Sequence, residues 1–385
     1  LPFLDFFKLR ASLGKVGNDR IKKIRFPYLS TVSTDYSSVT WPGSTVGESR
    51  VGANDLNWEE TTKMDIGVDL KMFNDKVELT ADIFKDKNKG IFQQRANIPE
   101  EAGFVTNPYT NIGGMESWGF DGNITFNHNF TKDFGMTVRG NWTFARNNVT
   151  YWEQSGVVYP YQSFVDVPYG VQRGLISLGL FKDQADINNS PIQTFSTVYP
   201  GDLKYKDQNG DNRIDELDVV PMGYNTICPE LFYSMGFDFE YKGLGINAQF
   251  QGAGHYTIQR SLSCFYAPLM NNQTISEHYL ENCWRSGKDN TDAIYPRLTT
   301  TESANNYRGN SVFMKNISFL KLRSAEIYYK LPESCIKPLR LREFKLFAKG
   351  MDLFSIDNVN ETDPEVIWST YPAQRSVHFG FDLAF

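Results

Sequence analysis

Alternation of apolar and polar residues with a period of two is the dominant pattern along this chain. A segment with this pattern forms a β-strand with one apolar face and one wet face. The final segment is a clear example, because its apolar residues alternate with smaller or polar ones up to the end of the chain. Those apolar residues are Val377, Phe379, Phe381, Leu383 and Phe385. The pattern predicts strands that lie between an apolar environment and an aqueous one.

Ten segments carry this alternation, and they predict ten strands. The strands lie near 6–15, 61–72, 77–89, 116–129, 134–147, 229–241, 245–252, 315–330, 343–352 and 376–385. Their connections alternate between short ones (73–75, 131–133, 242–243 and 331–342) and long ones (16–60, 90–115, 148–228, 253–314 and 353–375). A soluble sandwich has no reason to sort its loops by length, whereas outer-membrane barrels have short periplasmic turns and long extracellular loops. The pattern therefore predicts an all-β fold, an antiparallel transmembrane β-barrel segment with long extracellular loops.

Composition agrees with this prediction and excludes other classes of protein. The chain has 385 residues, 41% of them hydrophobic, and its formal net charge is −6. No run approaches the roughly 20 apolar residues that a membrane-spanning helix needs. The lack of a basic excess argues against nucleic acid as a partner.

The first predicted strand begins almost at the start of the chain, and ten strands closing alone would make a narrow barrel. We therefore expect 1–385 to be the C-terminal part of a larger barrel. Open sheet edges are not tolerated in lipid, so partner strands are expected outside this chain. Cleavage, a split gene or the division of the sequence would each explain its starting point.

Five motifs, in order along the chain, resemble those of the SusC/RagA-like TonB-dependent transporters of the Bacteroidetes outer membrane. Leu9–Asn18 is similar to the family's LRASYGxTGN segment, and Asn54–Asp69 to its NPDLKWE stretch with the following GxD. Pro200–Asp215 resembles PGDIKYxDxNGDGxID, Phe313–Arg323 resembles FxxxSYLRLRN, and Tyr371–Phe381 is similar to YPxxRSYxFGxN. The resemblance covers nearly the whole sequence, but only the C-terminal half or less of a family member.

The resemblance implies a barrel of about 22 strands closed by a plug. It also implies active import of oligomeric nutrients, glycans in the first place and peptides as the alternative, across the outer membrane. The partners that it implies are the TonB complex, a SusD-like surface lipoprotein as a lid, the lipid bilayer, and the remainder of the same transporter. The plug domain and the N-terminal strands would lie outside this chain. No chemistry on the substrate is implied, so we do not expect an enzyme.

An acidic loop at 207–218 has the oxygen spacing of a calcium-binding loop. Its side-chain ligands would be Asp207, Asn209, Asp211, Asp215 and Asp218, and the backbone carbonyl of Arg213 would complete the set. Asn212 stands where such loops place glycine, the last ligand is the shorter Asp, and no helix pattern precedes the loop. The alternative is a turn-rich loop closed by Asx turns. We predict Ca²⁺ as a cofactor here, with a structural role.

The long loops are rich in aromatic residues, and such rings can stack on sugars. Trp152, Tyr159 and Tyr161 are the substrate-binding candidates. The alternative is that these rings belong to the interfacial girdle or pack the loops together. Other aromatic residues of the long loops are Tyr151, Phe164, Tyr169, Phe265, Tyr266, Tyr279, Trp368 and Tyr371.

Cysteine spacing and carboxylate pairs give no candidate for zinc, redox or acid–base chemistry. Cys264 and Cys283 fall in one predicted loop and could form a disulfide, whereas Cys335 falls in a predicted periplasmic turn and could not reach them. The alternative to a transporter is a secreted calcium-binding β-sandwich of the lectin-like kind. In that fold the aromatic faces of 231–241 and 376–385 would pack on a second sheet rather than face lipid.

Overall fold

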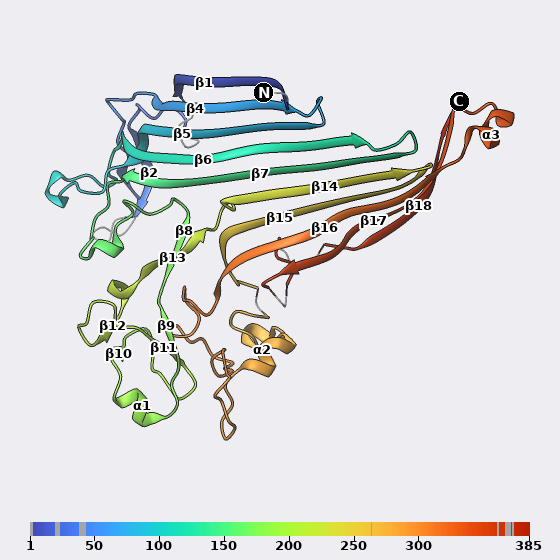
Figure 1. The fold of residues 1–385 in the computed structure, drawn as a ribbon. Helices are drawn as coiled ribbons and strands as arrows, with labels where there is room; N and C mark the ends of the chain where they lie inside the picture. Colours follow the sequence, from blue (N-terminus) through green and yellow to red (C-terminus); the bar gives the residue numbers. More distant parts are fainter. Residues whose placement is uncertain are drawn as a thin grey trace.

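The computed structural model describes residues 3–19, 24–37, 44–262, 264–359, 362–365, 371 and 373–385. Its main feature is one ten-stranded sheet in which every neighbouring pair is antiparallel (Figure 1). In sheet order the strands are β1 (Leu4–Asn18), β4 (Glu59–Met72), β5 (Val77–Gln94), β6 (Tyr109–Asn129), β7 (Phe134–Tyr151), β14 (Leu231–Tyr241), β15 (Leu244–Gln259), β16 (Met314–Lys330), β17 (Glu343–Asp357) and β18 (Ser376–Ala384). Each of the ten predicted strands is present, which confirms the predicted fold class.

The remaining elements are short and lie in the connections. Four two-stranded sheets are formed by β2 (Thr31–Ser37) with β3 (Ser44–Arg50), β8 (Val171–Gly174) with β13 (Val220–Asn225), β9 (Ser177–Leu180) with β11 (Leu203–Tyr205), and β10 (Ile192–Gln193) with β12 (Arg213–Ile214). The α-helices are α1 (Gln184–Asn188), α2 (Glu277–Asn282) and α3 (Glu333–Ile336). The 3₁₀ turns are η1 (Glu100–Ala102), η2 (Pro160–Gln162), η3 (Glu216–Asp218), η4 (Met270–Asn272) and η5 (Lys337–Leu339).

In the part of the chain that is described, no helix is long and apolar enough to cross a membrane.

The connections are sorted between the two ends of the sheet, as predicted. Figure 1 shows β8–β13, α1 and α2 gathered at one end, whereas α3 lies at the other. At the α3 end, β14 and β15 are joined by Lys242 and Gly243, which both have positive φ (50° and 84°). This is the backbone that a two-residue hairpin turn requires, and it matches the twist of the flanking strands. At the opposite end the strands extend beyond their predicted limits; β5, for example, continues to Gln94.

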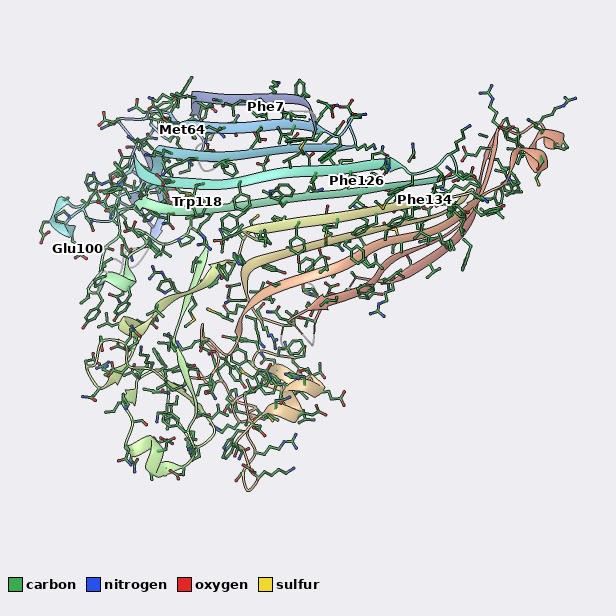
Figure 2. The ribbon with its side chains drawn as sticks, viewed as in Figure 1. Phe7, Met64, Glu100, Trp118, Phe126 and Phe134 are labelled. Carbon is green, nitrogen blue, oxygen red and sulfur yellow. The ribbon has the colours of Figure 1, made fainter. Side chains whose placement is uncertain are left out.

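One face of the sheet is apolar and exposed. Residues directly opposite each other in neighbouring strands share a face, as do alternate residues of one strand. Leu13 is opposite Met64, and Ile83 is opposite Ile66, two residues after Met64, so Leu13, Met64 and Ile83 lie on the same side. The side chains of Leu13 and Ile83 are 75% and 68% exposed, and Phe379 on β18 is 82% exposed. Five residues labelled in Figure 2 belong to this outward face: Phe7, Met64, Trp118, Phe126 and Phe134. Because β18 leaves its aromatic face uncovered, the structure favours a lipid-facing sheet over a soluble sandwich.

The other face carries ion pairs. Arg10 on β1 donates to Asp69 on β4 (Nε–Oδ2 3.1 Å) and to Asp82 on β5 (Nη2–Oδ2 2.9 Å). Gly67 lies opposite Arg10 and Asp82, and a Cβ atom there would come within 2.0 Å of the Asp82 carboxylate. A glycine is therefore needed for the two charges to meet. On the same face but nearer the β18 edge, Lys330 of β16 pairs with Glu240 of β14 at 2.8 Å. Charges on this face and apolar side chains on the other are typical of a barrel wall with a wet interior.

Both outer strands of the sheet have an unpaired edge. Among the described residues, β1 pairs with β4 alone and β18 with β17 alone. Unpaired N–H and C=O groups in hydrocarbon cost several kcal/mol each. A lipid-embedded sheet of this kind therefore needs both of these edges to be paired.

Two exposed cysteines at opposite ends of the sheet give a direct test of its orientation. Cys228 precedes β14 in a long connection, and Cys335 lies in α3 in a short one. On intact cells, a membrane-impermeant maleimide is expected to label Cys228 and to reach Cys335 only after the outer membrane is permeabilised. The Cys228→Ser and Cys335→Ser variants identify which thiol is labelled. Labelling of Cys335 on intact cells at the level of Cys228 would contradict the orientation.

Candidate functional site

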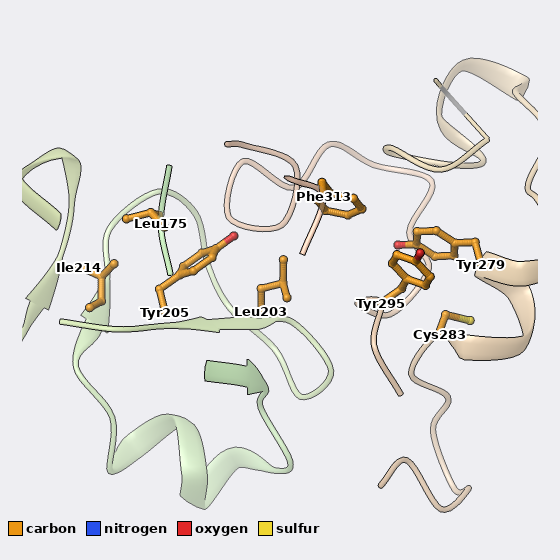
Figure 3. Close-up of a cluster of buried hydrophobic side chains, with 8 residues drawn as sticks. All are labelled: Leu175, Leu203, Tyr205, Ile214, Tyr279, Cys283, Tyr295 and Phe313. Atoms are coloured by element: carbon orange, nitrogen blue, oxygen red, sulfur yellow. The ribbon is translucent and has the colours of Figure 1, made fainter. Parts of the chain in front are cut away.

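Two long connections fold together into one unit at the end of the sheet opposite α3. We call residues 152–230 and 260–313 the loop module. Its core contains residues from both connections, all nearly or fully buried (Figure 3). They are Leu175, Leu203, Tyr205 and Ile214 from the first and Tyr279, Cys283, Tyr295 and Phe313 from the second. The rings of Tyr279 and Tyr295 stack at 4.4 Å. These segments are therefore a packed structure with its own core rather than separate loops.

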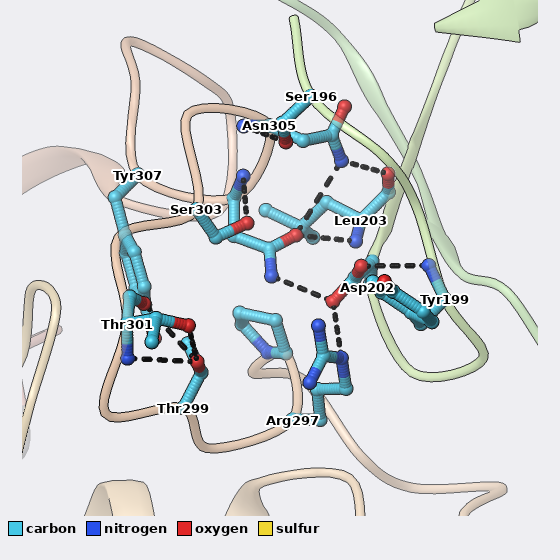
Figure 4. A network of polar contacts seen from close by, with 12 residues as sticks. Ser196, Tyr199, Asp202, Leu203, Arg297, Thr299, Thr301, Ser303, Asn305 and Tyr307 are labelled. Carbon is cyan, nitrogen blue, oxygen red and sulfur yellow. Dashed lines mark hydrogen bonds and ion pairs between the residues drawn. The ribbon is translucent and has the colours of Figure 1, made fainter.

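A fully buried carboxylate joins the two halves of the loop module (Figure 4). Asp202, from the first connection, is 0% exposed and accepts hydrogen bonds from Arg297 Nε and Asn306 Nδ2 of the second, both at 2.8 Å. Its other oxygen accepts the Tyr199 N–H at 2.8 Å. Burying a charge is costly unless it is paired and hydrogen-bonded. Asp202 meets both conditions only when the two connections are together.

Buried amides extend this network. Gln193 Nε2 donates to Asn305 Oδ1 at 2.7 Å, and Asn305 Nδ2 donates to the Leu203 carbonyl at 2.9 Å. The Tyr205 hydroxyl donates to the Asn305 carbonyl at 2.6 Å and accepts from Asn310 Nδ2 at 3.1 Å. Burial raises the pKa of Tyr205, so its hydroxyl stays protonated and remains a donor. The network gives the two connections one defined arrangement.

The loop module is attached to β15 of the sheet on one side and to the β5–β6 connection on the other. On one side the Tyr224 N–H donates to Thr257 Oγ1 of β15 at 2.7 Å. On the other, Glu153 accepts Arg95 Nε at 2.6 Å and the Asn97 N–H at 3.0 Å, both from the β5–β6 connection. Burial opposes ionisation of Glu153, but these donors hold its pKa below the usual value. The first connection is thus anchored to its neighbour just outside the sheet.

The acidic loop is closed by hydrogen bonds to its own backbone. Asp207 accepts the N–H groups of Gly210 (2.6 Å) and Asn212 (2.8 Å), and Asn212 has the positive φ, 62°, that the turn requires. Asp218 is almost fully buried and accepts the N–H groups of Gln208 (2.7 Å) and Asp215 (2.9 Å).

The other predicted metal ligands form similar contacts. Asp211 Oδ1 accepts the Arg213 N–H at 2.8 Å, and Asp211 Oδ2 accepts Asn209 Nδ2 at 3.0 Å. Asp215 accepts the Leu217 N–H at 2.9 Å. Within the described ranges no three His, Cys, Asp or Glu side chains converge as metal ligands. The oxygens in this arrangement serve Asx-type turns, and calcium binding stays a prediction.

Two of the three aromatic candidates stack on each other beside the acidic loop. The rings of Tyr159 and Tyr161 are parallel at 5.4 Å, and the Tyr161 hydroxyl donates to the Leu217 carbonyl at 2.8 Å. Trp152 instead lies against Tyr169, with ring centroids 6.2 Å apart. The tyrosine pair is half-buried, so part of both side chains is exposed to solvent. Trp368 lies outside the described residues.

Neither the core of the loop module nor Asp202 was identified from the sequence, although Asp202 and the core residues Leu203, Tyr205 and Ile214 lie within the Pro200–Asp215 motif. The available signal was the alternation of Asp202, Leu203, Lys204 and Tyr205, the last three of which form β11. Cys264 and Cys283 are free thiols, and Cys283 is buried in the module's core.

Comparisons with known proteins agree with this architecture. The family model described as "TonB dependent receptor-like, beta-barrel" matches residues 3–215. TonB-dependent receptor P3 of Formosa agariphila is 26% identical over 98% of this chain and 37% of its own length. TonB-dependent receptor SusC of Bacteroides thetaiotaomicron is 22% identical over 99% of this chain and 38% of its own. The chain therefore spans less than two-fifths of these curated relatives.

Solved structures show the same fold. The structure titled "Structure of the RagAB peptide transporter" superposes over 100% of this chain and 41% of its own, with a TM-score of 0.73 and 18% identity. The RagAB importer in its "open-open" state gives a TM-score of 0.74 with the same coverage.

The Asp202 network predicts that loss of this carboxylate unfolds the loop module. The Asp202→Ala change leaves Arg297 and Asn306 without their acceptor, and breaking a buried pair costs roughly 3–5 kcal/mol. We expect proteolysis of intact cells to cleave within 152–230 and 260–313 in this variant while the barrel stays folded. Glu216→Ala is the matched control, because Glu216 is 74% exposed and pairs with Arg308 at the surface. Equal resistance of the Asp202 variant and the wild type would contradict the proposed role of Asp202.

Proposed function

The chain belongs to the TonB-dependent receptor-like β-barrel family, and on this premise we propose that it is the C-terminal part of an outer-membrane importer of oligomeric nutrients. The family consists of transporters of the outer membrane and not of enzymes. The observation that carries the proposal is the division of the ten-stranded sheet into an exposed apolar face and a charged face. A wall of this kind separates lipid from a wet interior through which a solute passes.

The proposal includes further strands and a plug contributed by the remainder of the same transporter. The open edges of β1 and β18 require partner strands, and the chain covers only 37–38% of two full-length relatives. A barrel of about 22 strands would give a lumen wide enough to need a plug. Energy for import would come from the TonB complex, acting on parts of the transporter outside 1–385.

A SusD-like surface lipoprotein is the proposed partner at the outer surface. The loop module would give this partner a rigid binding surface, because a buried core and the Asp202 network hold the two connections in one arrangement. Anchoring of the module through Glu153 and Tyr224 would let contact with a lid reach the barrel strands. The mechanism would be capture of a substrate between lid and module, followed by passage through the lumen.

Glycans are the proposed substrates, with peptides as the alternative. The parallel Tyr159 and Tyr161 rings support a sugar-binding surface, since flat rings stack on the apolar faces of sugars. The peptide alternative is favoured by the likeness to the RagAB structures, which are described as a peptide transporter and a peptide importer.

The aromatic candidates give the test of substrate class. In the complete transporter complex, Tyr159→Ala and Trp152→Ala are each expected to weaken oligosaccharide binding about tenfold, as loss of an aromatic contact of about 1.4 kcal/mol does. Tyr161→Phe keeps the ring but removes the hydrogen bond to Leu217, so it separates stacking from loop position. Phe104→Ala, an exposed aromatic residue of another connection, is the control.

Calorimetry with a panel of oligosaccharides and peptides measures these effects. Loss of oligosaccharide binding in the two alanine variants, with the control unchanged, supports the glycan proposal. Binding of peptides alone would replace it with the peptide alternative. Absence of binding and import for both classes would contradict the proposed function.

A further inference from the structure

Three lysines form a ladder on the outward face of β5. Lys85, Lys87 and Lys89 alternate with the less exposed Asp86 and Asn88, and all three are exposed. The same face of β5 carries Ile83, Ala81 and Leu79 closer to the short turn. The ladder therefore continues the apolar, lipid-facing row directly into a row of positive charge.

The ladder lies at the end of the sheet nearest the long connections. β5 runs from the turn at 73–76 toward the connection at 95–108, so the lysines come last along the strand. Lys85 is directly opposite Trp118 of β6, which is labelled near that end in Figure 2. In the orientation proposed for the barrel, this height is the boundary between the outer leaflet and the cell surface.

The positive charge is only partly compensated by neighbouring carboxylates. Glu116 contacts both Lys85 (2.6 Å) and Lys87 (3.9 Å). Glu60 pairs with Lys15 of β1 at 2.5 Å. Lys89 has no carboxylate within ion-pair distance among the residues that the structure describes. Lys15 and the three ladder lysines thus carry four positive charges against the two negative charges of Glu60 and Glu116. The rest of this surface faces hydrocarbon.

A hollow of about 610 Å³ adjoins the top of the ladder. Its lining includes Lys89, the exposed side chain of Asn57 and the indole of Trp58, which is 69% exposed. Glu60, which pairs with Lys15, also lines it. Trp58 packs over Gly17 of β1, where a Cβ atom would come within 2.6 Å of the ring. The ring therefore lies against the backbone of Gly17 on one side and is exposed on the other. An exposed aromatic face beside an amide and an ammonium group suits a sugar ring, whose hydroxyl groups can hydrogen-bond to both polar groups.

We propose that this outward face of β1, β4 and β5 binds a phosphorylated glycolipid of the outer leaflet. Its phosphate groups would contact Lys85, Lys87 and Lys89, its sugar would lie in the hollow beside Trp58, and its acyl chains would cover the apolar row below Ile83. This lipid site is separate from the import path, because the ladder is on the face opposite the ion pairs of Arg10.

The arrangement favours a lipid over a soluble anion or a protein. The charged row and the apolar row are continuous on one strand face, so an occupant that contacts the lysines also meets hydrocarbon-facing side chains. A phosphorylated lipid can contact the lysines with its phosphates and the apolar row with its acyl chains, whereas a free phosphate can contact only the lysines. Lysines near a membrane surface each strengthen the attraction of anionic lipid, so three on one strand act together.

The test uses the complete transporter purified in detergent and native mass spectrometry with added lipid A that carries two phosphates. The variant K85A/K87A/K89A removes the ladder, and K132A/K242A/K337A removes three exposed lysines from connections at the opposite end of the sheet. We expect the ladder variant to lose lipid A binding about tenfold or more, and the control to keep it. Heat-dependent migration on gels checks that each barrel is folded.

A second variant gives an effect in the opposite direction, which a damaged barrel cannot imitate. Glu116→Gln frees Lys85 and Lys87 from their carboxylate and is expected to tighten lipid A binding about threefold or more. Lipid A without phosphates is expected to bind at the level of the ladder variant. The proposal is overturned by wild-type affinity in the ladder variant, by equal loss in the control, by no gain in Glu116→Gln, or by displacement of the lipid with inorganic phosphate alone.

Discussion

Backbone hydrogen bonding in an apolar solvent is the constraint on which the whole structure depends. A strand in lipid must pair on both sides, since each unpaired N–H or C=O group costs several kcal/mol. The antiparallel ladder from β1 to β18 meets this requirement at every internal strand. With the backbone paired, the alternation of side chains decides which face meets lipid and which meets water. The unpaired edges of β1 and β18 are also the reason why the proposed transporter needs strands from outside this chain.

The loop module at the end of this sheet is stabilised by different interactions. The loop module has a compact core and a buried carboxylate, Asp202, whose partners come from two connections far apart in the sequence. Such a network is costly when half-satisfied and gives a single arrangement when complete. The barrel wall and the loop module thus have different roles in the proposed transporter. The wall supplies a path and a lipid surface, and the module supplies a shaped surface for substrate and lid.

The sequence predicts the wall well and the loop module poorly. Period-two alternation is a local signal, so all ten strands could be placed, and the hairpin at Lys242–Gly243 with them. The module depends on contacts such as Asp202 with Arg297, which are 95 residues apart and have no local pattern. The spacing of Asp207 and its neighbours specifies oxygens but not their direction, and in the structure they accept backbone N–H groups. The stacking of Tyr159 on Tyr161 depends likewise on how the module folds.

Hydrogen exchange at the two outer strands tests the central claim most directly. In the transporter isolated from outer membranes, the amides of β1 and β18 should be protected to the same degree as those of β6 and β7, because partner strands complete the barrel. The contradicting result is fast exchange along β1 and β18 with protection confined to the internal strands. That result would show an open sheet, and a membrane-spanning barrel built from this chain would then be wrong.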